Sequence, residues 1–164
     1  MATTTTFHAI RDNIAGLIRA IAPEFMAAEG QGFNLVPDRR DLRKLAATPT
    51  SALFRMFEVR RHPDRAPEEP PWMDPSAYER NEWLRITVAY PVLPEMYGAD
   101  RDDDIEKVMA SDASLIRDAV FSPGDYVAGQ SLARVSIGAP DTADDRVWFQ
   151  ILDVQLTYTK SQTL

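Results

Sequence analysis

The segment EWLRITVAY, residues 82–90, alternates cleanly between two kinds of side chain. In an extended chain, successive side chains point to opposite faces, so the alternation sorts these residues into two rows. The first row consists of Leu84, Ile86, Val88 and Tyr90. The second row consists of Trp83, Arg85, Thr87 and Ala89. A strand that packs one face against a core has this pattern, so the segment predicts a half-buried β-strand.

Three further segments around this one are rich in strand-forming residues. The segment SALFRMFEVRR is dense in Leu, Phe, Met and Val, and it can pair antiparallel with residues 82–90 through a connection over residues 62–81. Two later segments flank the turn Pro140–Asp145 and form a second hairpin. The four predicted strands are Ser51–Arg61, Glu82–Tyr90, Val127–Ala139 and Arg146–Thr159.

Two amphipathic helices are predicted beside the strands. The first covers Thr6–Ala22, because six apolar residues recur there at spacings of three and four and Pro23 ends the pattern. The second covers Asp102–Phe121 and begins with aspartates, which the helix dipole favours. Residues 38–47 can form a short helix. The order α–β–β–α–β–β predicts one α+β domain over residues 1–164, a two-layer sandwich with a four-stranded, mainly antiparallel sheet and two helices on one face.

The last predicted strand has an unexpected second face. Val147, Phe149 and Ile151 make that face apolar at its beginning, although one face of an antiparallel sheet is normally solvated. Something must therefore cover this half of the face. Two covers remain open at this point, the segment of residues 24–47 and another subunit.

A proline-rich segment, RRHPDRAPEEPPWMDPS at residues 60–76, joins the first two strands. It has five prolines and no apolar periodicity, and a connection this long usually has a function. We predict a protruding loop over residues 61–81 that contacts a partner. The residues we assign to interfaces, in this loop and in the last strand, are Arg60, Arg61, Trp72, Met73, Tyr78, Val147, Phe149 and Ile151.

Composition and charge narrow the class of protein. The chain has no cysteine, no apolar run long enough to span a membrane and no secretory signal, which predicts a soluble protein made in a cytoplasm. Residues 1–65 carry ten basic and seven acidic residues, a balance of +3, whereas the remainder carries eight and eighteen, a balance of −10. An acidic protein gains little from phosphate neutralisation, so we expect no specific nucleic-acid binding.

No motif points to catalysis, a cofactor or a metal. The tripeptide His62–Asp64 matches one found in J-domain co-chaperones, but there it joins two helices and here it follows a predicted strand. The run Asp100–Asp104 resembles the start of a calcium loop, but Ile105 and Ser111 stand where an EF-hand needs glycine and glutamate. We therefore predict a protein without catalytic, cofactor-binding or metal residues.

The chain resembles the tail terminator, or tail completion, proteins of tailed bacteriophages. The resemblance lies in the layout of the opening helix FHAIRDNIAGLIRAIA, the strand EWLRITVAYP, the helix DDDIEKVMASDASLIRDAV and the closing pair SLARVSIGAP and RVWFQILDVQLTYT. It covers nearly the whole chain, but the family has no diagnostic site motif that could be transferred residue by residue.

The resemblance implies a non-enzymatic structural protein of the virion. Such proteins form a ring, typically a hexamer, at the end of the tail tube, where the ring stops tube growth and joins the tail to the head. The implied partners are further copies of the chain, the tail tube protein and the head–tail connector or neck proteins, while DNA passes through without specific binding. Two alternatives stay open: another neck protein, such as a head-completion or connector protein, and a small ligand-binding or enzymatic α+β domain.

Overall fold

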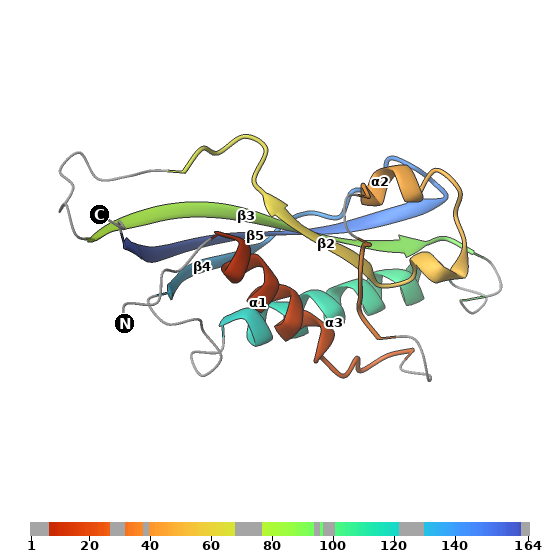
Figure 1. Cartoon of the computed structure of the whole chain (residues 1–164). Coiled ribbons are helices and arrows are strands. Elements are labelled where there is room, and N and C mark those ends of the chain that lie inside the picture. The colour runs from red at the N-terminus through yellow and green to blue at the C-terminus, as the bar shows by residue number, and fades with distance from the viewer. Residues whose placement is uncertain are drawn as a thin grey trace.

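The structure of the chain, a computed structural model, describes residues 7–26, 32–37, 40–67, 77–93, 96, 101–121 and 130–161. The strands form a long curved sheet, and the helices pack against it (Figure 1). In chain order the elements are α1 (Phe7–Arg19), β1 (Asn34–Leu35), α2 (Leu42–Leu45), the 3-10 turn η1 (Ser51–Leu53), β2 (Met56–Arg61), β3 (Ala77–Pro91), α3 (Arg101–Phe121), β4 (Gln130–Ile137) and β5 (Val147–Ser161).

The described strands form one mixed sheet in the order β1-β2-β3-β5-β4. Strands β3 and β5 pair antiparallel over their whole length, from Ala77 opposite Ser161 to Pro91 opposite Val147. The two predicted hairpins, β2 with β3 and β4 with β5, are both antiparallel. The α+β class is confirmed, but the expectation of four strands was wrong. The fifth strand, β1, has two residues and runs parallel to β2, and a strand this short shows no alternation in the sequence.

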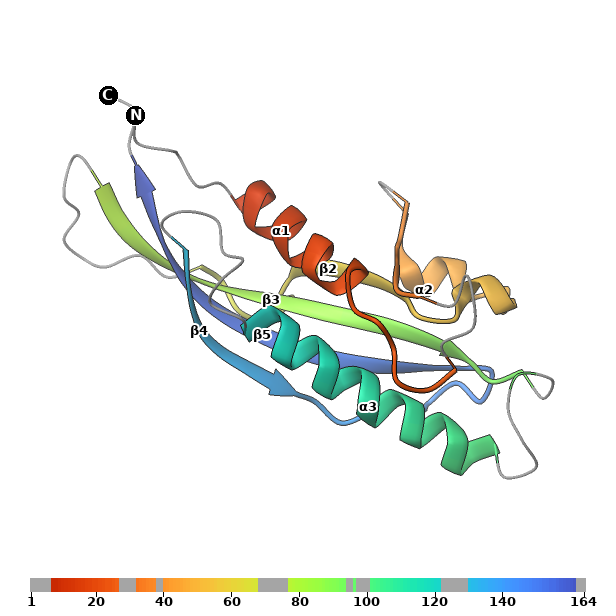
Figure 2. The same cartoon turned by 90° about the horizontal axis from the view of Figure 1, so that it is seen from below.

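Helices α1 and α3 lie side by side on one face of the sheet, as predicted (Figures 1 and 2). The row Leu84, Ile86 and Val88 of β3 is fully buried beneath them. Their apolar side chains and those of the sheet make one continuous core. The helical stripe in this core consists of Ile10, Ile14, Ile18, Ile105, Met109 and Ile116.

Helix α2 covers one end of the opposite face, and this settles the question of Val147 and Phe149. Both are buried, in a second apolar cluster that contains Leu42 and Ala46. Asp41 caps α2 by accepting a hydrogen bond from the Arg43 amide. The cover is thus the chain's own Val36, Leu42 and Ala46, and the assignment of Val147 and Phe149 to a subunit interface is corrected.

Two predicted boundaries also change. The segment 51–61 is not one strand, because η1 occupies its start and Arg55, with a positive φ of 58°, separates η1 from β2. Strand β3 begins at Ala77, so the connection from β2 covers residues 62–76 and not 62–81. The extra residues of β3 pair with the equally long β5, a partner that the hairpin pattern did not reveal.

Phe149→Ala should therefore destabilise the monomer and not an assembly. Removal of this ring from a buried cluster is expected to lower the free energy of unfolding by about 3–5 kcal/mol. Urea denaturation followed by circular dichroism measures the change. Ile137→Ala, at a side chain that is 40% exposed, is the control and should lower the free energy of unfolding by less than about 1 kcal/mol. An unchanged unfolding midpoint for Phe149→Ala would place the ring outside the core.

Candidate functional site

The predicted interface residues do not gather at one place. Arg60 and Arg61 lie at the exposed end of β2, where the Arg61 guanidinium stacks 4.2 Å from the centre of the Phe7 ring. Ile151 is half-buried on the face of the sheet that α2 covers only in part. Tyr78 belongs to β3, and its side chain lies outside the description. The predicted anchors at positions 72 and 73, Trp72 and Met73, lie outside the described residues.

Beyond α2, this second face of the sheet is formed by cross-strand pairs of β3 and β5. Ile151 stands opposite the buried Thr87. We call the remainder of the face the open sheet face, and it consists of Trp83, Arg85, Ile151, Asp153 and Gln155, all half-buried. An aromatic ring, an aliphatic side chain and an ion pair thus share one face of the sheet.

A hydrogen-bonded ion pair occupies the middle of the open sheet face. Arg85 binds Asp153 in a fork, with distances of 2.9 Å from Nε to Oδ1 and 3.3 Å from Nη2 to Oδ2. His62, the first residue after β2, lies 2.9 Å from Arg85 Nη2 through its Nε2. The same His62 nitrogen is 3.4 Å from Asp153 Oδ2. A two-pronged pair of this kind fixes both side chains in place.

These contacts shift the pKa of Asp153. Partial burial by itself would raise the pKa of this carboxyl, but the hydrogen bond and charge of Arg85, together with His62, outweigh burial and lower it. Asp153 therefore keeps its negative charge across the physiological range. The Asp153 carboxylate thus provides a fixed negative charge beside the Arg85 guanidinium.

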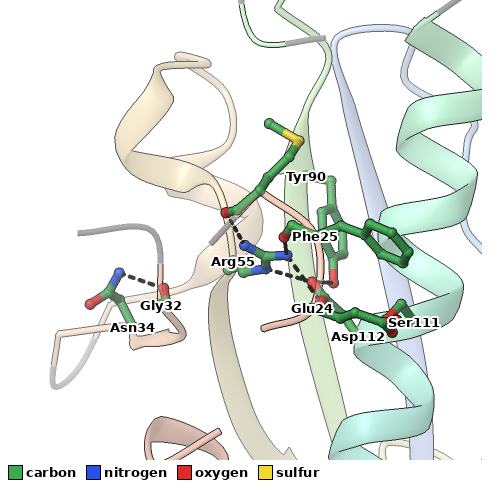
Figure 3. A network of polar contacts seen from close by, with 9 residues as sticks. Glu24, Phe25, Gly32, Asn34, Arg55, Tyr90, Ser111 and Asp112 are labelled. Atoms are coloured by element: carbon green, nitrogen blue, oxygen red, sulfur yellow. Dashed lines mark hydrogen bonds and ion pairs between the residues drawn. The ribbon is translucent and has the colours of Figure 1, made fainter. Parts of the chain in front are cut away.

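A second polar group lies in the interior, between β2, β3 and α3 (Figure 3). Arg55 and Asp112 are both fully buried, and they pair through Nε and Oδ2 at 2.6 Å and through Nη2 and Oδ1 at 3.1 Å. The Tyr90 hydroxyl donates to the same Asp112 Oδ2 at 2.9 Å. Burial raises the pKa of Asp112, although the hydrogen bonds and the charge of Arg55 oppose the shift.

Arg55 also binds the chain that follows α1. Its guanidinium donates to the carbonyl oxygens of Phe25 and Met26 (Figure 3). The rings of Phe33 and Phe54 lie against it, with their centres 5.7 and 4.7 Å from the guanidinium carbon. A buried charge needs such complete pairing to be tolerated.

The buried group connects three segments of the fold through hydrogen bonds. Both Asp112 oxygens accept hydrogen bonds from Arg55, and Oδ2 also accepts one from Tyr90, so the carboxylate is held in place by its partners. The group was not predicted from the sequence, because Arg55 falls inside a segment predicted to be a strand and Asp112 inside a predicted helix. A charged residue between Phe54 and Met56 was the one available signal.

The structure has two clefts whose lining is described. The first has a volume of about 550 Å³ and lies between α1, β1 and the outer edge of β2; we call it the α1–β2 cleft. The second has a volume of about 510 Å³ and lies between α3 and the turn that joins β4 to β5. Neither is lined by Arg55, Asp112 or Tyr90.

The tripeptide His62–Asp64 and the run Asp100–Asp104 do not have the surroundings of the J-domain and calcium-loop motifs that they resemble. His62–Asp64 follows a strand, and the Asp64 amide donates to His62 Nδ1, which closes a local turn. Asp104 lies in the first turn of α3, and Asp100 is outside the described residues. Within the described part of the chain, no group of three or more His, Asp or Glu side chains is arranged to hold a metal ion.

Comparison with protein-family models gives no matching family, and comparison with curated proteins gives no similar sequence. Among the helices that the structure describes, none has the length and apolar character needed to cross a membrane. The evidence on function therefore comes from the surfaces of the fold.

The first prediction from this geometry concerns the buried pair. Asp112→Asn removes the negative charge and leaves the Arg55 guanidinium buried without its counter-charge. The free energy of unfolding should fall by about 3–5 kcal/mol. Chemical denaturation measures the change, with Asp118→Asn on the exposed side of α3 as a control that should change it by less than about 0.5 kcal/mol.

A combined variant separates charge pairing from simple loss of packing. Replacement of all three partners, Arg55→Met, Asp112→Leu and Tyr90→Phe, removes every buried charge of the group and keeps much of its volume. Apolar replacement of a buried pair is often neutral, so this variant should be more stable than Asp112→Asn alone. A combined variant that is less stable than the single one would show that the hydrogen bonds to the loop carbonyls dominate.

The second prediction concerns acid stability. The folded-state pKa of Asp153 lies below its ordinary value of 3.8, so the unfolded chain binds the proton first as the pH falls. The stability that Asp153 contributes is complete above that value and is lost as the pH falls through the folded-state pKa. Asp153→Asn should therefore be less stable than the natural chain at pH 7, and the difference should shrink below about pH 4. A difference that does not vary with pH would contradict the ion pair.

Proposed function

We propose that the chain is a non-enzymatic structural protein of a tailed-bacteriophage virion. Identical subunits form a ring, six in number as in the proteins it resembles, at the end of the tail tube. The ring stops tube growth and joins the tail to the head. The observation that carries the proposal is the open sheet face, a half-buried surface that combines an aromatic residue, an aliphatic residue and a fixed ion pair.

The composition of the open sheet face is that of a protein interface. Trp and Arg are enriched in interfaces, and Trp83, Arg85 and Ile151 stand close together on this face. The Arg85–Asp153 fork holds two charges in known positions, so a neighbour can be matched to them without ordering long side chains. The face is therefore better suited to stable contact with another protein than to exposure to solvent.

A ring needs two unlike surfaces on each subunit, because head-to-tail contacts close only when one surface meets a different one. The long β3–β5 ladder supplies a candidate for the second surface. Strand β2 pairs with β3 only as far as Leu84, whereas β3 and β5 continue to Ala77 and Ser161. Figures 1 and 2 show this end of the ladder reaching beyond α1 and α3. We propose that it reaches a neighbouring subunit.

Residues 62–67, the described start of the connection over residues 62–76, leave β2 on the side where this ladder extends (Figure 1). We propose that it is an assembly arm that uses Trp72 and Met73 as its contacts, together with Arg60, Arg61 and Tyr78 at its two ends. Prolines restrict the unbound chain and so lower the entropy lost on docking. The tail tube protein and the neck proteins are the proposed partners besides the chain itself.

The charge of the chain suits a channel for DNA. The net charge is −7, and residues 66–164 have a balance of −10. Negative walls repel the phosphate backbone and prevent retention of the DNA as it passes. The same charge gives no support to a protein that holds DNA.

Ring formation can be tested by light scattering coupled to size exclusion. The natural chain is expected to give six times the subunit mass of 18.4 kDa, alone or with purified tail tubes. Ile151→Glu places a charge on the open sheet face, outside the buried core, and should give a folded monomer. Ala143→Glu, in the exposed turn before β5, is the matched control and should keep the ring. Negative-stain images of the larger species show whether it is closed.

Two results would contradict the proposal. The first is a natural chain that stays monomeric at high concentration and in the presence of tail tubes. The second is an Ile151→Glu variant that assembles as well as Ala143→Glu, which would remove the open sheet face from the interface. Circular dichroism of each variant separates loss of assembly from loss of folding.

A further inference from the structure

Strand β2 has an outer backbone edge that β1 occupies only in part. The His62 amide donates to the Trp83 carbonyl, and Arg61 is paired with Leu84, so every second residue of β2 faces β3 and the others face outward. The outward carbonyls of Arg55 and Phe57 accept from the Asn34 and Val36 amides.

Past this point, none of the strands that the structure describes lies beside the edge. By the same alternation, the amide and carbonyl of Val59 and of Arg61 point outward. No backbone hydrogen bond from a described residue reaches them. Pro37 follows Val36 and has no amide proton to continue the ladder. The outer edge at Val59–Arg61 can therefore take an added strand in line with β1.

The α1–β2 cleft runs along this open edge. Helix α1 supplies one wall with a single stripe of residues at spacings of three and four. Val59 and Arg60 of β2 form the floor, and Pro37 and Arg40 close the end. The cleft volume of about 550 Å³ leaves room for side chains of an added strand. The α1 stripe consists of His8, Arg11, Asp12 and Ala15.

The charges in the cleft favour an acidic occupant. Arg60 pairs with Glu58 at 2.9 Å and donates to the Arg40 carbonyl at 2.8 Å, which neutralises Glu58 and fixes Arg60. Arg11 lies 3.8 Å from Asp12, a loose contact. The guanidinium of the exposed Arg40 makes no ion pair with a described carboxylate. The cleft therefore keeps an excess of positive charge in a chain whose net charge is −7.

We propose that the open edge of β2 and the α1–β2 cleft form a docking site for an extended acidic peptide of a partner protein. The peptide adds as a strand beside Val59–Arg61, so its backbone forms hydrogen bonds with the outward amide and carbonyl groups of Val59 and Arg61. Alternate side chains point toward α1, where Arg11 stands, and toward Arg40 and Arg60. The site lies at the opposite edge of the sheet from β4 and apart from the open sheet face, and it shares Arg60 and Arg61 with one end of the proposed assembly arm.

The test uses a fluorescein-labelled peptide of sequence Thr-Glu-Val-Glu-Val-Glu-Thr and measures fluorescence anisotropy at low salt. Saturable binding is expected. Two matched peptides separate the contributions: one carries N-methyl groups on alternate residues, and one has Lys in place of Glu. Each should bind about tenfold more weakly or worse, because the first cannot form the backbone ladder and the second repels the arginines.

Protein variants locate the site. Arg40→Glu should weaken binding of the acidic peptide by about tenfold or more. Arg19→Glu, at the exposed end of α1 and outside the cleft, should leave the affinity for the peptide unchanged. Amide hydrogen exchange should show new protection at Val59 and Arg61 when the peptide is bound. Equal melting temperatures for both variants confirm that folding is intact.

Each possible result either supports the peptide site or overturns it. No saturable binding, equal binding of the N-methylated peptide, or protection elsewhere than β2 would overturn the proposal. So would an Arg40→Glu variant that changes self-association but not peptide affinity, because the edge would then belong to a second copy of the chain. Ile151→Glu should abolish rings and keep peptide binding, so failure of the ring and failure of this site are distinguishable.

Discussion

The Arg55–Asp112 pair is the interaction on which the arrangement of the layers depends. Arg55 sits between η1 and β2 and binds α3 through Asp112 and the chain after α1 through the Phe25 and Met26 carbonyls. Two buried charges are stable only when all their partners are in place, so the pair admits one relative position of these segments. The positive φ of Arg55, which costs about 1–2 kcal/mol, is the backbone geometry that turns the side chain into the interior.

The two faces of the sheet differ because of how this arrangement distributes the helices. Helices α1 and α3 lie on the face that holds the buried pair, and α2, with four residues, covers only one end of the other (Figure 1). The remainder of that face has a fixed ion pair, which His62 contacts, and the outer edge of β2 has outward backbone groups at Val59 and Arg61 that no described residue pairs. We regard these two places as the parts of the fold available to other proteins, which suits a role in assembly.

The predictions from the sequence were accurate where a periodic pattern was long. The alternation at residues 82–90 and the spacing of isoleucines in α1 follow directly from burial on one side, so both elements were found. Strand β1 and helix α2 were missed or only partly found, because two to four residues do not complete a period. The open sheet face was not predicted as a site, since Arg85 and Asp153 are 68 residues apart and meet only through the pairing of β3 with β5.

The sequence by itself determined the α+β class, the two long helices and the paired strands, because local periodicity reports which side of an element is buried. Only the tertiary structure decided which residues cover each buried side. Val147 and Phe149 form an apolar row that the sequence leaves open to a subunit or to the chain itself, and Leu42 of α2 fills the place. Arg55 and Asp112 resemble surface residues in the sequence. They are buried because each charge has the other as a partner in the folded chain, and a buried charge is tolerated only when it is paired. A pairing between residues far apart in the sequence leaves no local pattern.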